Sequence, residues 1–157
     1  MSQNDPLNVS RLSGLGATAL LWAGLALPAT AEEPAASPLA LLAADQSLEW
    51  GACPPFFSQA CRMTAVHGNP AEANADVFFK VGGGDELPLH WHTSAERMVL
   101  VQGELTVRYE GHDAVTLTPG TYAYGPPKLP HDGRCNSAEA CILFIAFEQP
   151  VDAHEVK

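Results

Sequence analysis

The sequence has 157 residues, about the length of one domain. Hydrophobic residues make up 46% of it and charged residues 17%, a balance typical of a globular chain and too apolar for a disordered one. The 8 Lys and Arg residues against 18 Asp and Glu residues give a formal net charge of −10. This balance excludes nucleic-acid binders that need a basic face, and it argues against attachment to anionic membrane surfaces.

The first 31 residues have the features of a secretory signal peptide. Arg11 precedes an apolar run over residues 12–27, and Ala29-Thr30-Ala31 places small residues where a signal peptidase cleaves. The run is shorter than the ~20 residues that cross a bilayer. The alternative is an anchor that stays attached. We expect cleavage, no stable membrane insertion afterwards, and a periplasmic or secreted protein.

The four cysteines agree with export, because an even number in an exported chain indicates disulfides. Among three connectivities, we favour the local pairs Cys53–Cys61 and Cys135–Cys141, each of which closes a short loop. The alternative is a four-thiolate metal site. The spacing within each pair is longer than the Cys-x2–4-Cys of zinc knuckles, which disfavours that alternative.

Beyond the cysteine-bounded loop, the pattern predicts short strands separated by turn residues, without helical periodicity. Glycine, proline or asparagine follows nearly every apolar run. Such spacing is typical of a β-sandwich or β-barrel. In chain order, the expected strands cover residues 62–66, 77–81, 97–101, 105–109, 114–117, 122–124 and 142–147.

Two of the six histidines are separated by a single residue. Alternate side chains of a strand point to the same face, so His90 and His92 are expected to converge while Trp91 points away. Glu96 follows after a turn-forming segment, at the head of the next strand. Two imidazoles and one carboxylate are a good ligand set for a divalent transition metal. The alternative is two unrelated histidines and a surface glutamate.

The surrounding glycines favour the metal site. The pattern Gly84-x5-His90-x-His92-x3-Glu96-x6-Gly103 matches the first motif of the cupin superfamily, which the chain therefore resembles. Downstream, Pro119-Gly120, Pro126 and His131 resemble the second cupin motif, although Thr121 stands where an acidic residue is usual. A more specific similarity is to the cupin domain of zinc-dependent anti-sigma factors.

The resemblance implies an all-β fold, a single cupin-type jelly-roll β-barrel preceded by the signal peptide. It implies that His131 joins His90, His92 and Glu96 as ligands of one divalent metal per chain, which is Fe, Mn, Zn, Cu or Ni. It also implies a homodimer through sheet edges. The expected segments are a signal peptide (1–31), a leader with a disulfide loop (32–61), the barrel (62–149) and a tail (150–157).

Three function classes are consistent with this interpretation. The first, which the sequence leads us to expect and to which the other two are alternatives, is a metal-dependent oxidoreductase, dioxygenase-like, that acts on a small organic molecule. The second is a non-redox isomerase or lyase in which the metal is a Lewis acid. The third is a non-catalytic protein that binds or senses a small ligand or a metal. Tyr122 and Tyr124, on one face of the strand that leads to His131, are candidate catalytic residues for proton transfer; the alternative is that they pack in the barrel.

Overall fold

The computed structural model of the protein describes residues 37–157, which contain β-strands and no helix. The expected signal peptide over residues 1–31 lies outside this range. No helix of membrane-spanning length and apolarity occurs in the described range. In chain order the strands are β1 (Gly51–Ala52), β2 (Arg62–His67), β3 (Ala75–Val81), β4 (Glu86–Trp91), β5 (Glu96–Gln102), β6 (Leu105–Tyr109), β7 (Val115–Leu117), β8 (Tyr122–Gly125), β9 (His131–Cys135), β10 (Cys141–Phe147) and β11 (His154–Glu155).

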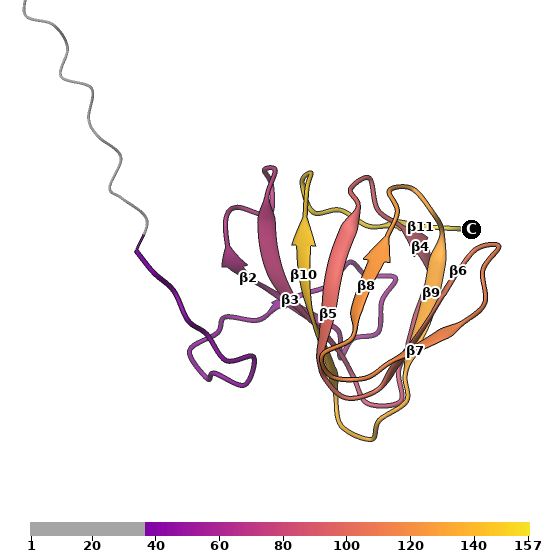
Figure 1. The fold of residues 1–157 in the computed structure, drawn as a ribbon, viewed down its shortest axis with the longest axis horizontal. Coiled ribbons are helices and arrows are strands. Elements are labelled where there is room, and N and C mark those ends of the chain that lie inside the picture. Colours follow the sequence, from indigo (N-terminus) through magenta and orange to yellow (C-terminus); the bar gives the residue numbers. More distant parts are fainter. Residues whose placement is uncertain (1–36) are drawn as a thin grey trace, which may run out of the picture. The chain divides into compact units, whose positions relative to one another are not determined.

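The strands form two antiparallel sheets that face each other (Figure 1). The six-stranded sheet has the order β1-β2-β3-β10-β5-β8, and the five-stranded sheet has the order β11-β4-β9-β6-β7. From β3 to β6, consecutive strands belong to alternate sheets, so the loops between them connect one sheet to the other. This is the jelly-roll arrangement, and it confirms the predicted all-β fold.

The period-2 pattern of the sequence decides which side chains enter the interior. In β5, Glu96, Met98 and Leu100 are buried while the residues between them are more exposed, and Leu105 and Val107 repeat the pattern in β6. Gly103 makes the turn between these strands with φ +86°, a conformation that L side chains rarely adopt. The backbone conformation at this position therefore explains the glycine of the motif, and the turn at Gly103 lets β5 and β6 enter opposite sheets.

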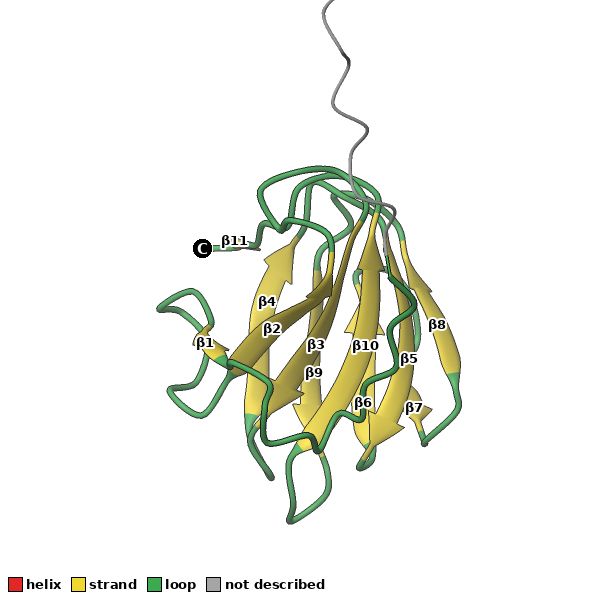
Figure 2. Cartoon of the chain, turned by 90° about the vertical axis from the view of Figure 1, so that its left-hand side faces the viewer, coloured by secondary structure: helices red, strands yellow, loops and turns green. Residues whose placement is uncertain are grey.

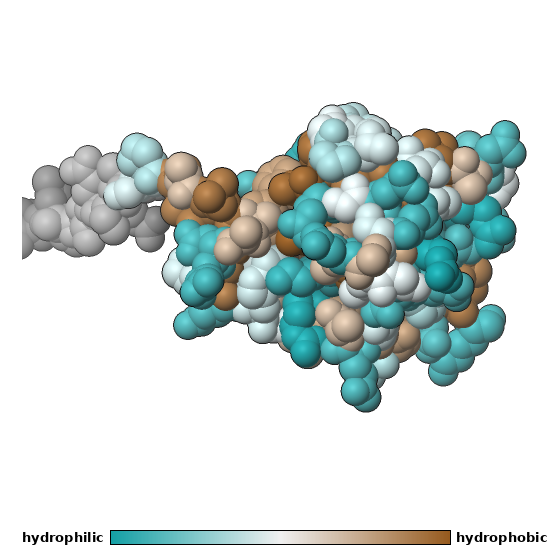
Figure 3. Space-filling view, turned by 90° about the horizontal axis from the view of Figure 1, so that it is seen from below, coloured by the Kyte–Doolittle hydropathy of each residue, from teal (hydrophilic) through white to brown (hydrophobic). Residues whose placement is uncertain are grey.

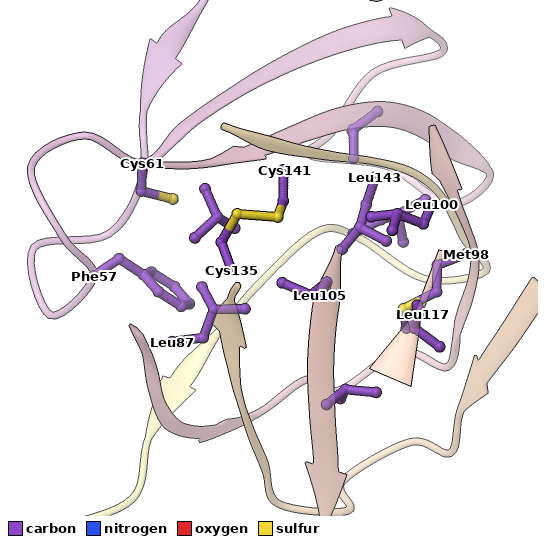
Figure 4. Packing of buried hydrophobic residues seen from close by; sticks show 14 of the residues in the cluster. Phe57, Cys61, Leu87, Met98, Leu100, Leu105, Leu117, Cys135, Cys141 and Leu143 are labelled. Carbon is purple, nitrogen blue, oxygen red and sulfur yellow. A yellow bond between two sulfur atoms is a disulfide. The ribbon is translucent and has the colours of Figure 1, made fainter. Parts of the chain in front are cut away.

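Both cysteine pairs form disulfides, with the local connectivity that the sequence favours. The Cys135–Cys141 bridge joins β9 of one sheet to β10 of the other, and both cysteines are fully buried. Figure 4 shows this bridge inside the hydrophobic cluster, near Leu105. The sulfur atoms thus pack as core atoms as well as linking the two sheets.

The segments on either side of the predicted barrel, 62–149, contribute short strands and a core residue to the fold, and the predicted boundaries themselves stay a prediction. The compact unit covers Leu39–Lys157. On the N-terminal side, β1 pairs with β2, and the loop closed by Cys53–Cys61 brings Phe57 into the core with 7% exposure. On the C-terminal side, the expected tail forms β11, which pairs with β4 (Figure 2). Two-residue strands carry too short an apolar pattern to be recognised in the sequence.

The surface drawn in Figure 3 is mainly hydrophilic, with hydrophobic side chains in small groups between the polar ones. Apolar side chains are instead concentrated between the two sheets, where the candidate site lies.

Candidate metal centre

Three histidines and one glutamate meet between the sheets. His90 in β4 and His92, the residue after the end of that strand, are both buried, while Trp91 between them stacks on His154 with ring centroids 4.0 Å apart. His131 opens β9, where it is the cross-strand partner of His90. Glu96 opens β5 in the opposite sheet. All four side chains are buried, so the structure brings the predicted ligands together.

The four side chains lie at contact distance. One ring nitrogen from each of His90, His92 and His131 lies within 4.8 Å of those of the other two. The two oxygens of the Glu96 carboxylate divide between two histidines: Oε1 lies 3.4 Å from His92 Nε2, and Oε2 lies 3.4 Å from His131 Nε2. The carboxylate therefore closes one side of the three-histidine group.

The backbone orients all three imidazoles. Each Nδ1 lies at hydrogen-bond distance from a carbonyl oxygen: His90 from that of Pro88 at 2.7 Å, His92 from that of Asp152 at 2.5 Å, and His131 from that of Leu129 at 3.1 Å. A carbonyl can only accept, so each Nδ1 carries the proton. Every Nε2 is then left with a lone pair, the state in which histidine binds a metal.

Burial sets the protonation states of the group. Desolvation, followed by the neighbouring imidazoles, lowers the pKa of His90 to about 3, and desolvation also lowers the pKa of His92 and His131. Desolvation raises the pKa of Glu96 to about 7, against an opposing effect of His131. The histidines are therefore neutral and ready to coordinate at neutral pH, while the carboxyl group needs a positive charge nearby to ionise fully.

A cavity of about 130 Å³ opens beside the four side chains. The polar groups gather at one end of it, where His90, His92, Glu96 and His131 lie. The rest of the wall is almost entirely apolar and comes from both sheets and the disulfide loop, including Phe57, Val77, Phe79, Met98, Leu143 and Ile145. An ion held at this end would face a largely apolar space of small-molecule size.

Residues 77–147, which carry the whole group, match the family described as the cupin domain. The chain therefore contains a cupin domain. No curated protein sequence matches it. The closer similarity to the cupin domain of zinc-dependent anti-sigma factors stays a prediction.

Solved structures show the same fold as this cupin at low sequence identity. The DMSP lyase DddQ from Ruegeria pomeroyi DSS-3 is 16% identical over 69% of this chain and 61% of its own, with a TM-score of 0.61. The polyketide cyclase RemF from Streptomyces resistomycificus is 15% identical over 71% and 81%, with a TM-score of 0.59. KdgF from Halomonas sp. is 20% identical over 64% and 88%, with a TM-score of 0.53. The chain spans under two thirds of the length of the DMSP lyase, and these identities establish the fold alone.

The two tyrosines predicted as catalytic do not lie in the cavity of this cupin. Tyr122 and Tyr124 lie on the outer face of the edge strand β8, with 61% and 51% exposure. The buried position of β8 is Gly125, the residue after Tyr124. Both tyrosines therefore lie on the opposite, outer face of the strand, and the expectation that they reach the cavity is corrected.

A different tyrosine lines the cavity. Tyr109 ends β6, pairs with His131 across the strands, and has its ring centroid 4.9 Å from that imidazole. Burial and the Glu96 carboxylate raise the pKa of Tyr109 well above its ordinary value, so its hydroxyl stays protonated. The alternation Leu105-x-Val107-x-Tyr109 could have placed this ring inward, but only the register between β6 and β9 sets it beside a ligand.

The C-terminal segment supports the site as well as the fold of this cupin. Val151, Asp152 and Ala153 line the cavity, and the Asp152 carbonyl is the partner of His92. The Asp152 side chain accepts a hydrogen bond from the Thr93 backbone N–H at 2.8 Å and contacts His154 Nε2 at 3.1 Å. These bonds hold the segment against the end of β4, so residues beyond the predicted barrel fix the orientation of one candidate ligand.

Proposed function

We propose that this cupin is a metal-dependent enzyme that acts on a small organic molecule. His90, His92 and His131 would hold one divalent transition metal through Nε2, and Glu96 would be the fourth ligand. The observation that carries the proposal is the set of three carbonyl partners at Nδ1, because it leaves three Nε2 lone pairs in one buried place. Neutral imidazoles and a carboxylate suit Fe, Mn, Zn, Cu or Ni.

The residues around this group have complementary roles in the proposal. A bound divalent ion supplies a Lewis acid that polarises an oxygen atom of the substrate. The carbonyls of Pro88, Asp152 and Leu129 keep the imidazoles in place, and the apolar wall excludes water from the reacting end. The cavity volume limits the substrate to a small molecule, which supports an enzyme or small-ligand protein rather than a macromolecule binder.

Non-redox chemistry is the reaction class that we favour. Structures with the same fold include proteins named as a DMSP lyase and a polyketide cyclase, and neither name describes an oxidation. A dioxygenase-like oxidoreductase is the second candidate, because three neutral imidazoles and a carboxylate would also hold a redox-active ion such as iron. Turnover of a substrate under nitrogen would support the first class, and oxygen consumption during turnover would support the second.

Export and dimerisation complete the proposal. Two disulfides fit an oxidising compartment, either periplasmic or extracellular. A homodimer through the sheet edges is expected, and light scattering that gives a monomer mass at micromolar concentration would exclude it.

Elemental analysis tests the metal centre directly. The protein is purified without a His tag, beside a His90→Ala/His92→Ala variant and a His112→Ala control, whose histidine is exposed in a turn. We expect close to one metal per chain in the parent and the control, and little in the double variant. If none of the three binds any of the five candidate ions after reconstitution, the metal centre is refuted and a non-catalytic binding role takes its place.

A further inference from the structure

Tyr109 carries an unusual hydroxyl group. Within residues 37–157, its Oη is the buried side-chain oxygen or nitrogen without any hydrogen-bond partner. A phenol needs a partner when it is buried, because leaving the group unpaired sacrifices the hydrogen bonds that it makes with water. Natural proteins retain such groups where a ligand or a solvent molecule supplies the partner.

The hydroxyl is held beside the proposed ligands. The Tyr109 ring lies against His131, and both residues line the cavity. A Cβ atom placed on Gly125 would lie 2.6 Å from Tyr109 Oη and 3.1 Å from Glu96 Oε2. The hydroxyl and the carboxylate thus both pack against the bare backbone of Gly125, at the polar end of the cavity. A glycine at this position leaves the room that the tyrosine occupies.

From this geometry we propose that Tyr109 is a catalytic residue whose hydroxyl donates a hydrogen bond to an oxygen atom of the bound substrate. The inference rests on the metal centre proposed above. It also assigns the substrate class, because the cavity has one polar end and one apolar body. The substrate has a carboxylate or carbonyl oxygen at the histidines and a compact apolar remainder against residues such as Val77, Met98 and Ile145.

The size of the apolar remainder follows from the cavity volume. The space measures about 130 Å³, and an apolar cavity of about 150 Å³ is known to accommodate benzene. A substrate with about four to six carbon atoms in all, including the carbon of its carboxylate or carbonyl, would therefore fill the space without displacing the wall. A polyhydroxylated body would leave its hydroxyl groups unpaired against the apolar side chains, which costs binding energy.

The test uses the full exported protein loaded with Co²⁺, whose visible spectrum reports both metal binding and a new ligand at the metal. Isobutyrate is the probe with a carboxylate and a compact apolar body, and glycerate is the polar probe of similar size. The variant Tyr109→Phe removes only the hydroxyl group. The matched variant Tyr122→Phe removes the same group from an exposed position on β8.

We expect all three proteins to bind Co²⁺ equally, and the metal-free Tyr109→Phe variant to unfold at no lower urea concentration than the parent. Isobutyrate is expected to bind about tenfold more weakly to Tyr109→Phe, the loss of one hydrogen bond to a charged oxygen, and unchanged to Tyr122→Phe. It is expected to bind the parent more tightly than glycerate does.

Other results separate the two proposals. Failure of the parent to bind Co²⁺ overturns the metal centre before any probe is added. Equal isobutyrate affinity in the parent and Tyr109→Phe overturns the role of Tyr109 while the metal centre stands. Loss of Co²⁺ in Tyr109→Phe also overturns it, because the hydroxyl would then hold the metal ligands. Absence of isobutyrate binding, or tighter binding of glycerate, overturns the assigned substrate class.

Discussion

In the metal-free protein, the difference in the free energy of unfolding between the Glu96→Gln variant and the parent should depend on pH. The folded chain keeps the pKa of this buried carboxyl at about 7, against the ordinary value of 4.5. Below pH 4.5 the group is protonated in both the folded and the unfolded chain. As the pH rises above that value, the unfolded chain ionises Glu96 while the folded chain retains the proton. The parent therefore loses stability up to about pH 7, and the Glu96→Gln variant, which has no group to titrate there, does not.

The size of the effect follows from the shift in pKa. Each unit between the unfolded and folded values corresponds to 1.36 kcal/mol, so the interval from pH 5.5 to 7 gives about 2 kcal/mol. The three histidines also titrate, with lowered pKa values that make both proteins more stable as pH rises from acid. Burial is the largest cause of that lowering, and the variant keeps it. The Glu96 carboxylate acts on the pKa of His131 alone among the three and only once it has ionised, so below pH 7 the difference between the two proteins reports mainly the carboxyl group.

Urea unfolding of both chelator-treated proteins at pH 5.5 and pH 8 measures this difference. We expect Glu96→Gln to gain about 2 kcal/mol relative to the parent between the two pH values. Adding a divalent metal should reverse the order at pH 8, because the ion favours the ionised carboxylate and binds only the folded chain. A stability difference that is the same at both pH values would refute the burial argument for Glu96.

Three further changes probe the surroundings of the site. Ending the chain at residue 149 removes the Asp152 carbonyl that accepts a hydrogen bond from His92, so metal affinity, measured by competition with a chelator, should fall about 10- to 100-fold. The control His154→Ala leaves that carbonyl in place and should keep metal affinity within about threefold of the parent. Equal losses in the two variants would contradict the role of the carbonyl. Replacing both Cys135 and Cys141 by alanine opens the short loop between β9 and β10 and should cost at least about 2 kcal/mol in urea unfolding; an unchanged midpoint would show that the bridge contributes nothing. Gly125→Ala places a methyl group against the Tyr109 hydroxyl and should weaken isobutyrate binding to the Co²⁺ form as Tyr109→Phe does; undiminished binding would mean that the hydroxyl has room to move away.

The sequence motif was sufficient to predict the β-fold and the four residues that meet in the site. Its spacing predicts that His90 and His92 share one face and that Glu96 starts the next strand, and both features depend only on local geometry. The local cysteine pairs were predictable for the same reason, because each lies at the ends of a short loop. Features that depend only on residues close together in the sequence could therefore be predicted without a structure.

Features that depend on which strands pair, and in which register, could not be predicted from the sequence. The sequence shows three tyrosines at strand positions, and the choice among them required knowing that β6 lies beside β9 and that β8 is an edge strand. Tyr122 and Tyr124 satisfied the simple criterion of shared parity, but their shared face is the outer one. The C-terminal strand was missed because Asp152, Ala153 and His154 show no apolar alternation; the segment is held by hydrogen bonds and by the stack on Trp91.

The division of the site between the sheets has a physical consequence. His90, His131 and Tyr109 are cross-strand neighbours on the five-stranded sheet, so their spacing is fixed by that sheet alone. Glu96 comes from the six-stranded sheet, and its distance from the imidazoles depends on how closely the two sheets pack. The Cys135–Cys141 bridge ties those sheets together, and the apolar core fills the space between them. Sheet packing therefore controls the distance between Glu96 and the imidazoles. The spacing between His131 and Tyr109 does not depend on it, because both residues lie on the same sheet.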